Sequence, residues 1–407
     1  MSDPNLLDRQ PLPYPIAAPA APAAPPEWAE LREHCPAARI QLPSGDEATL
    51  VTRYADVRNV LADPRFTRDL AAPDAARIGD AEQGGPFDNP MARDLFADGH
   101  QRWRRMVGRW FTAKRMASLR PGMEAMAEKL VDGMLEQGAP ADLVQHVAFP
   151  FPAWVICTML GAPDRDRQKF ADWADTLLAL SDIDSGAVGN AREEFAAYVT
   201  GLVEAKRVQP GEDLISELLS ATDAEGRPMS DEALVATAQA LLIGGLETTA
   251  GAIAKGVATL LADRRHWERL VADPSLVRTA VEELLRFDPN ISFGLPRYLS
   301  EDAELSDGTV LPSGDTVMCL MASANRDAAV FEGADGLDLA RTPNTHLAFG
   351  AGAHSCIGQP LARTELQVMF DVLLRRLPTL ELAVGAEELT RVDGLIVGRL
   401  AEVPVRW

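Results

Sequence analysis

The chain has 407 residues, and its 60 acidic and 39 basic side chains give a formal net charge of −21. With 47% hydrophobic and 24% charged residues, it has the composition of a globular protein and not of a disordered or fibrous one. The negative charge excludes nucleic acid as the main partner and disfavours anionic lipid, because both are themselves negative. The sequence contains no signal peptide and no run of 18 apolar residues, so we expect a cytoplasmic protein with no membrane partner.

Proline and alanine dominate residues 11–26, which predicts an extended, weakly ordered leader over residues 1–27. No linker or repeat divides the rest of the chain, so residues 28–407 are expected to form one domain. Hydrophobic periodicity predicts a mostly α fold with small β-sheets.

The predicted elements, in chain order, are a strand at 48–52, helices at 54–62, 102–111, 121–137, 149–160, 164–180 and 191–207, a very long helix from a cap at Ser230 to about residue 263, a helix from 273 to before 288, a hairpin at 304–310, a helix at 360–377 and a C-terminal hairpin at 389–405. The long helix is apolar on most faces, so we expect it to run through the middle of the protein.

A glycine-rich loop with one cysteine, from Phe349 to Gly358, directly precedes the helix predicted at 360–377. Glycine permits a positive φ and close approach to a flat ligand, and a helix N-terminus stabilises a thiolate. A thiolate at Cys356 would suit the axial position of a haem iron. Considered alone, however, Cys356 is more readily explained as a buried structural cysteine, because most cysteines are structural.

The loop resembles the haem-binding signature of the cytochrome P450 superfamily, FxxGxHxCxG, at Phe349, Gly352, His354, Cys356 and Gly358. The resemblance covers nearly the whole chain from about residue 28. It implies the P450 fold, with haem b between the long central helix and the helix that follows the cysteine loop. It also implies that Cys356 is the iron ligand and that Phe349 and Gly352 contact the haem.

Glu283 and Arg286 form an ExxR pair on one face of the helix predicted between residues 273 and 288. A surface ion pair of little energetic value is the alternative for this spacing. In the P450 family, such a pair meets an arginine in the segment before the cysteine loop, and Arg341 matches it. The resemblance implies a structural network that locks the loop and takes no part in catalysis.

Gly244 and Gly245 interrupt the middle of the long helix, where each glycine costs about 1 kcal/mol relative to alanine. A flat cofactor packed on the helix, or a local widening that admits O2 and water, would offset that cost. Glu247 and Thr248 follow, and an acid beside a hydroxyl suits proton delivery, although simple helix packing with a back-bonded threonine explains the same residues. The motif resembles the family's oxygen-activation motif. That resemblance implies that Thr248 is the hydrogen-bond partner of bound dioxygen and that Glu247 relays protons.

Four cationic side chains match the family's contacts to the haem propionates, namely His100, Arg104, Arg297 and His354. Cationic donors suit carboxylates through charge-assisted hydrogen bonds. For His100 alone, a capping or surface role remains open.

The resemblance also implies a substrate pocket lined by Phe87, Met91, Leu95, Leu242, Gly245, Phe293, Leu295, Ile396 and Val397. These residues are mostly apolar, as expected for an apolar ligand, and ordinary core packing is the alternative for each.

Together these features predict a soluble haem-thiolate monooxygenase of actinobacterial type that acts as a monomer. It would insert one oxygen atom of O2 into a C–H or C=C bond of an apolar small molecule, with electrons from NAD(P)H through an iron–sulfur ferredoxin and its reductase. The chain is similar to tailoring enzymes of polyketide, macrolide and terpenoid antibiotics. The alternatives are a peroxide-driven peroxygenase, a catabolic hydroxylase of a small terpene or xenobiotic, and a haem-based binding or sensor protein.

The negative charge is not evenly distributed along the chain. Between His100 and Met116 there is no acidic residue and there are six cations, Arg102, Arg104, Arg105, Arg109, Lys114 and Arg115. In the family this segment lies where electrons enter, and such ferredoxins are acidic. We therefore expect a basic docking face on an otherwise acidic protein, reduced in size because Arg104 is assigned to the propionates.

Overall fold

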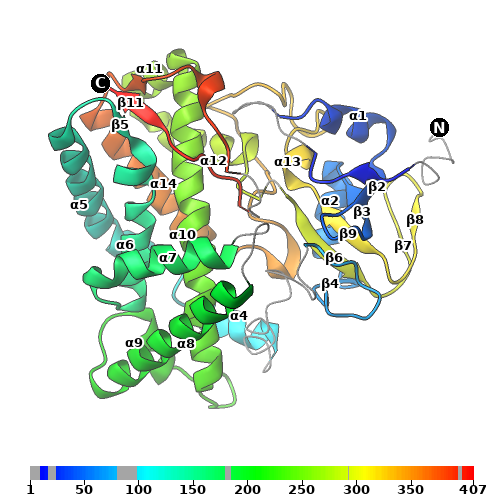
Figure 1. The fold of residues 1–407 in the computed structure, drawn as a ribbon, viewed down its shortest axis with the longest axis horizontal. Helices are drawn as coiled ribbons and strands as arrows, with labels where there is room; N and C mark the ends of the chain where they lie inside the picture. Colours follow the sequence, from blue (N-terminus) through cyan, green and yellow to red (C-terminus); the bar gives the residue numbers. More distant parts are fainter. Residues whose placement is uncertain (1–9, 17–23, 80–98, 179–184, 292, 393–396) are drawn as a thin grey trace. The chain divides into compact units, whose positions relative to one another are not determined.

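A computed structural model of the chain describes residues 10–16, 24–79, 99–178, 185–291, 293–392 and 397–407. The chain forms two compact units, which are described here one at a time (Figure 1). Unit 1 consists of residues 1–88, 255–356 and 384–401, and unit 2 of residues 89–254, 357–383 and 402–407.

Unit 1 is built on a six-stranded mixed sheet with the strand order β1-β2-β3-β9-β6-β4. Its strands are β1 (Leu12–Pro13), β2 (Ala37–Gln41), β3 (Glu47–Val51), β9 (Thr316–Cys319), β6 (Leu295–Leu299) and β4 (Phe66–Thr67). A separate hairpin joins β7 (Ala303–Glu304) to β8 (Val310–Leu311). The helices are α1 (Glu27–His34), α2 (Tyr54–Ala62), α11 (Arg264–Ala272), α12 (Val277–Phe287) and α13 (Met321–Ala324).

The core of unit 1 lies between α2 and this sheet. Val57, Val60 and Leu61 of α2 cluster with Val317 of β9 and with Leu347, which precedes the cysteine loop. The apolar face of a short amphipathic helix therefore supports the segment that leads into the loop.

Unit 2 is helical. It contains α4 (His100–Gly108), α5 (Ala113–Gln137), α6 (Pro150–Leu160), α7 (Arg167–Leu178), α8 (Ser185–Val208), α9 (Leu214–Ser220), α14 (Gln359–Arg376) and most of α10 (Asp231–Ala262). A small sheet in the order β10-β11-β5 joins Glu381–Leu382, Pro404–Arg406 and Ala141–Asp142. Helix α14 packs along α5.

The long helix α10 agrees with the sequence prediction, and Ser230 Oγ accepts a hydrogen bond from the backbone N–H of Ala233, 3.2 Å away. By length and composition α10 could cross a membrane, but 67% of its most apolar window is buried inside the protein. That burial is typical of a core helix, and the apolar faces of α10 therefore serve packing.

Several parts of the chain differ from their sequence predictions; α8, for example, begins at Ser185 and not at residue 191. Helix α5 starts after Thr112, whose Oγ1 accepts from Arg115 N, so Pro121 lies inside the helix and not at its start. In its described residues 10–16 the leader contains β1 and is not weakly ordered, because Tyr14 is buried and its backbone N–H donates to Gln41 O at 2.9 Å. Within the described residues, the C-terminal hairpin joins 390–392 to 399–401, where Arg391 pairs with Leu400, and where Val392 N donates to Arg399 O and Ala401 N donates to Thr390 O, both at 2.9 Å. The predicted hairpin does not continue to residue 405, because β11 pairs with β5 and β10.

Candidate active site

The cysteine loop of unit 1 is held by its own backbone. Cys356 N donates to Phe349 O at 2.8 Å, and Gly350 N donates to Leu347 O at 2.8 Å. Gly350 and Gly352 have φ values of 69° and 70°, a conformation that favours glycine. Cys356 and His354 are both exposed on this loop.

Gly352 also brings the loop close to α2. A Cβ at this position would lie 2.6 Å from Cα of Ala62 and 2.8 Å from O of Leu61. Only glycine permits this approach, which fixes the loop against the helix that the core of unit 1 supports. The loop therefore presents Cys356 from a rigid base.

Glu283, Arg286 and Arg341 form the network expected from the sequence. Arg286 donates two bonds of 2.8 Å to the Glu283 carboxylate, and Arg341 Nε donates to Glu283 Oε2 at 3.0 Å. The side chains of Glu283 and Arg286 are fully buried, so the pair is not the surface ion pair of the alternative interpretation. Removing one partner of such a pair leaves a buried charge without compensation.

The network extends further than the sequence indicated. Arg286 also donates to the backbone carbonyls of Asn325, Ala334 and Gly336, and Asn344 Nδ2 donates to Glu283 Oε2 at 3.1 Å. Closer to the loop, Leu347 N donates to Asn325 Oδ1 at 2.7 Å. These bonds tie residues 325–347 to α12, and carbonyl partners of this kind leave no signal in a sequence.

Arg297, on β6 of unit 1, has the environment of an anion-binding residue. Only 5% of it is exposed, and within the described ranges its guanidinium has no carboxylate partner. Its Nη1 donates to the neighbouring Pro296 O at 2.8 Å, and desolvation by burial lowers its pKa. A buried cation without a counter-ion is costly, so this residue fits a bound carboxylate such as a haem propionate.

The middle of α10, in unit 2, combines packed and open positions. Leu242 is fully buried, and a Cβ on Gly245 would lie 2.5 Å from Cδ1 of Ile156, so Gly245 allows α6 to approach. Gly244 is exposed, and a Cβ there would meet nothing within 4 Å. Helix α10 stays α-helical here, which does not support local widening, one of the two explanations offered for the glycines. Gly245 allows close packing of α6, and Gly244 leaves an open position on the helix.

Thr248 and Glu247 follow on the same helix. Thr248 is half-buried, and its Oγ1 donates to Gly244 O at 2.6 Å, which is the back-bonded arrangement of the packing alternative. This bond directs the hydroxyl proton to a backbone carbonyl and leaves the oxygen lone pairs as acceptors. Glu247 is 2% exposed. An acid and a hydroxyl therefore sit next to the open position at Gly244.

Helix α4 of unit 2 begins at His100, and Arg104 lies one turn further on. The helix is anchored between them, because Trp103 Nε1 donates to Thr237 Oγ1 at 3.0 Å and Arg102 Nε donates to Asp223 Oδ2 at 2.6 Å. The Arg102 guanidinium lowers the pKa of Asp223 by hydrogen bonding. Arg102, counted above as part of a basic face, is therefore buried and paired.

The predicted pocket residues fall into three groups. Phe87, Met91, Leu95 and Ile396 lie outside the described residues. Phe293 and Val397 of unit 1 and Leu242 of unit 2 are buried, and Phe293 packs edge-on against Tyr14 with 5.1 Å between ring centroids. Leu295 and Gly245 are half-buried. A pocket role for these residues stays a prediction.

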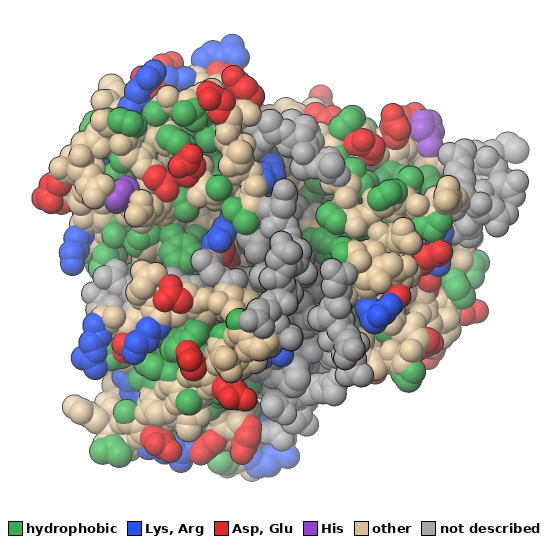
Figure 2. Space-filling model, in the orientation of Figure 1, with side chains coloured by type: hydrophobic (Ala, Val, Ile, Leu, Met, Phe, Trp, Pro, Cys, Tyr) green, Lys and Arg blue, Asp and Glu red, His purple; other side chains and the backbone are tan. Residues whose placement is uncertain are grey.

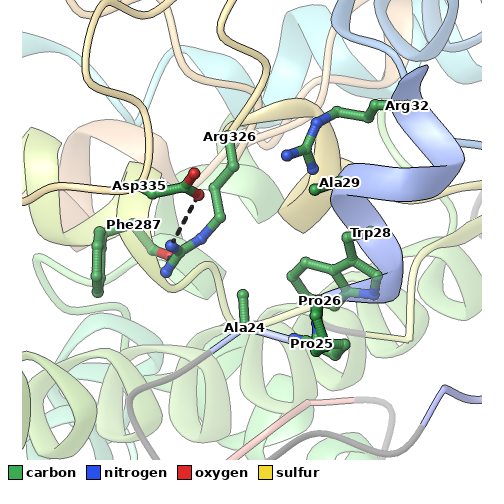
Figure 3. Close-up of a pocket in the computed structure, with 9 residues that line it drawn as sticks. All are labelled: Ala24, Pro25, Pro26, Trp28, Ala29, Arg32, Phe287, Arg326 and Asp335. Carbon is green, nitrogen blue, oxygen red and sulfur yellow. Dashed lines mark hydrogen bonds and ion pairs between the residues drawn. The ribbon is translucent and has the colours of Figure 1, made fainter.

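A separate recess lies where the leader meets α1 in unit 1 (Figure 3). Its lining includes Trp28, Phe287, Arg326 and Asp335. Arg326 lies over the Phe287 ring at 4.0 Å, with Nη1 3.5 Å from Asp335 Oδ1. None of the predicted site residues lines this recess, and Arg326 is accounted for by its ring and ion-pair contacts.

Among the described residues, no group of three or more His, Cys, Asp or Glu side chains could hold a metal ion. Cys356, exposed on its glycine-rich loop, is the metal ligand that the sequence predicts, and this role stays a prediction. One thiolate ligand for the iron, together with cationic side chains that bind the haem propionates, is typical of a haem-thiolate protein.

Comparison with known proteins agrees with this pattern. Residues 45–383 match the family model of cytochrome P450. The chain is 40% identical to nocardicin C N-oxygenase of Nocardia uniformis subsp. tsuyamanensis, over 97% of this chain and 98% of that protein. It is 39% identical to mycinamicin IV hydroxylase/epoxidase of Micromonospora griseorubida, over 93% and 94% of the two chains.

A solved structure, that of the putative thioether synthase SgvP involved in the tailoring step of griseoviridin, matches with a TM-score of 0.90 at 39% identity, covering 98% of this chain and all of that one. The protein therefore belongs to the cytochrome P450 family and has the P450 fold. It is a P450 monooxygenase, and membership of the family implies a haem iron, O2 and a supply of electrons.

Proposed function

We propose that this P450 monooxygenase oxidises an apolar natural product of the polyketide, macrolide or terpenoid class in antibiotic biosynthesis. The observation that carries the proposal is the similarity, over more than nine-tenths of the chain, to nocardicin C N-oxygenase and mycinamicin IV hydroxylase/epoxidase. Since those relatives differ in their substrates, the similarity supports a class of substrate and not one compound.

The described residues suit the binding of haem b. Cys356, exposed on its rigid loop, would hold the iron. Arg297 and His354 of unit 1, and His100 and Arg104 of unit 2, would each bind a propionate through charge-assisted bonds. The haem supplies the iron chemistry that places one atom of O2 on the substrate and reduces the other to water.

Proton delivery would fall to Thr248 and Glu247. The Thr248 hydroxyl donates its proton to Gly244 O, which leaves the lone pairs of its oxygen able to accept a further hydrogen bond. Glu247, nearly fully buried, would pass protons to that hydroxyl. The peroxygenase alternative needs neither residue, because peroxide brings its own protons and electrons.

Electrons would come from NAD(P)H through an iron–sulfur ferredoxin and its reductase. Acidic and basic side chains are interspersed on the face drawn in Figure 2. On α4 and the start of α5, Arg105, Arg109 and Lys114 are exposed, while Arg115 bonds Glu217 at 2.7 Å. We assign the docking of an acidic ferredoxin to these three exposed cations, on a cytoplasmic monomer.

The substrate class is tested by titrating the ferric holoenzyme with compounds and recording the spin state of the haem. The panel should contain a macrolide such as mycinamicin IV, nocardicin C, a small terpene and an aromatic xenobiotic. We expect a saturable shift with a natural product, followed by incorporation of one ¹⁸O atom from ¹⁸O2 on addition of NADPH, ferredoxin and reductase. A spin-state shift only with the terpene or xenobiotic would favour the catabolic hydroxylase. Turnover with hydrogen peroxide alone would favour the peroxygenase. Binding without turnover under either condition would favour the sensor.

A further inference from the structure

Arg68, the residue that follows β4, and Arg297 of β6 lie near each other at the edge of the six-stranded sheet in unit 1, close enough for the charge of Arg297 to lower the pKa of Arg68. Strand β4 pairs antiparallel with β6 in the register Phe66 to Leu299 and Thr67 to Tyr298. The printed pairing ends at Thr67, and continued by one residue it would place Arg68 opposite Arg297. Side chains alternate between the two faces of a sheet, so both arginines share the face of Phe66 and Leu299, which belong to the apolar core. Directly opposed side chains have Cβ atoms roughly 4.5–5.5 Å apart.

Among the described residues, neither Arg68 nor Arg297 is paired with an acidic side chain. Other arginines of unit 1 do have one: Arg39 bonds Asp315, Arg65 bonds Asp63, and Arg77 bonds Asp46. On the opposite face of the same strand pair, Tyr298 donates its hydroxyl to Asp74 at 2.9 Å. The acids of this region therefore pair elsewhere, and two like charges are left facing each other.

Opposed like charges destabilise a strand pair unless an anion lies between them. Arg68 is exposed, so a ligand can reach it. Desolvation and the charge of Arg297 together lower the pKa of Arg68 to about 10. Arg297 itself is buried and desolvated. Two planar guanidinium groups at this spacing present a double set of donors that matches the oxygens of a carboxylate.

We propose that Arg68 joins Arg297 in binding a carboxylate, so that the site is a paired-arginine clamp and not a single cation. The proposal rests on the role assigned above to Arg297. The carboxylate belongs either to the haem, as a propionate, or to a substrate that carries one. Arg68 is a positioning residue in the first case and a specificity-determining residue in the second.

The test compares Arg68→Gln and Arg68→Lys with the control variant Arg65→Gln. Arg65 lies three residues before Arg68, and its guanidinium is already paired with Asp63. All are studied as holoenzymes. For the propionate, the measurement is the rate of haem transfer from the ferric enzyme to apomyoglobin. Because Arg68→Gln loses a charge-assisted hydrogen bond to the propionate, it should release haem about tenfold faster than wild type. Arg68→Lys should release haem at an intermediate rate, and Arg65→Gln at the wild-type rate.

For a substrate carboxylate, the probes are dodecanoic acid and its methyl ester, titrated by the spin-state shift. If the clamp receives this group, the wild type should prefer the acid, and Arg68→Gln should weaken binding of the acid about tenfold and leave the ester unaffected. The idea is overturned if Arg68→Gln and Arg65→Gln release haem at the same rate and the wild type shows no preference for the acid.

Failure of the clamp is distinguishable from failure of the proposed function. The wild-type holoenzyme must first show the thiolate-type band of its reduced CO complex, which depends on Cys356 and not on Arg68. Arg68→Lys keeps the charge and the chain length, so it remains informative if Arg68→Gln proves unstable.

Discussion

Arg286 and Glu283 form a fully buried ion pair with two hydrogen bonds of 2.8 Å, and the same carboxylate accepts from Arg341 and Asn344. The backbone N–H of Asp338 also donates to Glu283 Oε1 at 2.8 Å, so donors from two segments, α12 and residues 338–344, converge on one acid. The Glu283 carboxylate therefore fixes the position of the chain segment before the cysteine loop.

Glu283→Gln should lower the free energy of unfolding by about 3–5 kcal/mol, because it leaves two buried guanidinium groups without a counter-ion. Denaturant unfolding monitored by circular dichroism measures the effect. Glu268→Gln is the matched control, since Glu268 also pairs with an arginine on its own helix but is exposed, and its change should stay below about 1 kcal/mol. Equal losses in the two variants would contradict a structural role for the network.

Cys356→Ala should abolish the red-shifted band of the reduced CO complex, because no thiolate would remain at the iron. Cys319→Ala should retain this band, since Cys319 is buried in β9 and burial raises the pKa of its thiol to about 12. Absorption difference spectra of the two purified variants are the measurement. A wild-type protein without the band would refute the assignment of Cys356.

Gly352→Ala should destabilise the loop more than Gly350→Ala. Both glycines have a φ near 70°, so either substitution costs about 1–2 kcal/mol of backbone strain. Only at position 352 would the new Cβ also meet backbone atoms, at 2.6 Å from Ala62 Cα, whereas at 350 the nearest atom is 3.9 Å away. Haem content after purification and unfolding midpoints report the difference. Indistinguishable variants would show that the approach of the loop to α2 is unimportant.

Thr248→Ala should divert electrons from product to hydrogen peroxide, because the hydroxyl that holds the proton is lost. The measured ratio is peroxide formed per NADPH consumed, with the native or a surrogate ferredoxin. Thr248→Ser keeps the hydroxyl and its bond to Gly244 O, and it should restore most of the coupling. Unchanged coupling in the alanine variant would limit Thr248 to helix packing.

Lys114→Glu should slow ferredoxin-supported reduction several-fold at low ionic strength, and the difference should shrink as salt screens the charges. Lys129 is the control, because it is an exposed lysine on the same helix, roughly 22 Å further along at ~1.5 Å per residue. Stopped-flow reduction of both charge-reversal variants over a salt series provides the data. If the two variants behave alike, or if salt has no effect on the wild type, the docking assignment to α4 and the start of α5 is wrong.

Much of this protein follows from local sequence. The signature from Phe349 to Gly358 predicts the thiolate ligand, because its glycines, histidine and cysteine all lie within ten consecutive residues. Helix α2 agrees with its predicted bounds, and Ser230 caps α10, because periodicity and capping depend on neighbours a few residues apart. Local sequence gave the wrong start for α5: a proline is typical of a helix start, but Pro121 lies inside the helix.

Only the tertiary structure decided the contacts between distant segments. Sequence spacing paired Glu283 with Arg286, but it could not show that Asn344 and three backbone carbonyls complete the network. Nor could it place Arg68 near Arg297, because strand register depends on which edges meet in the folded sheet. The charge count of the sequence also could not show that Arg102 is buried and paired with Asp223. A sequence determines which groups are available, whereas burial and register determine which of them face one another and at what free energy.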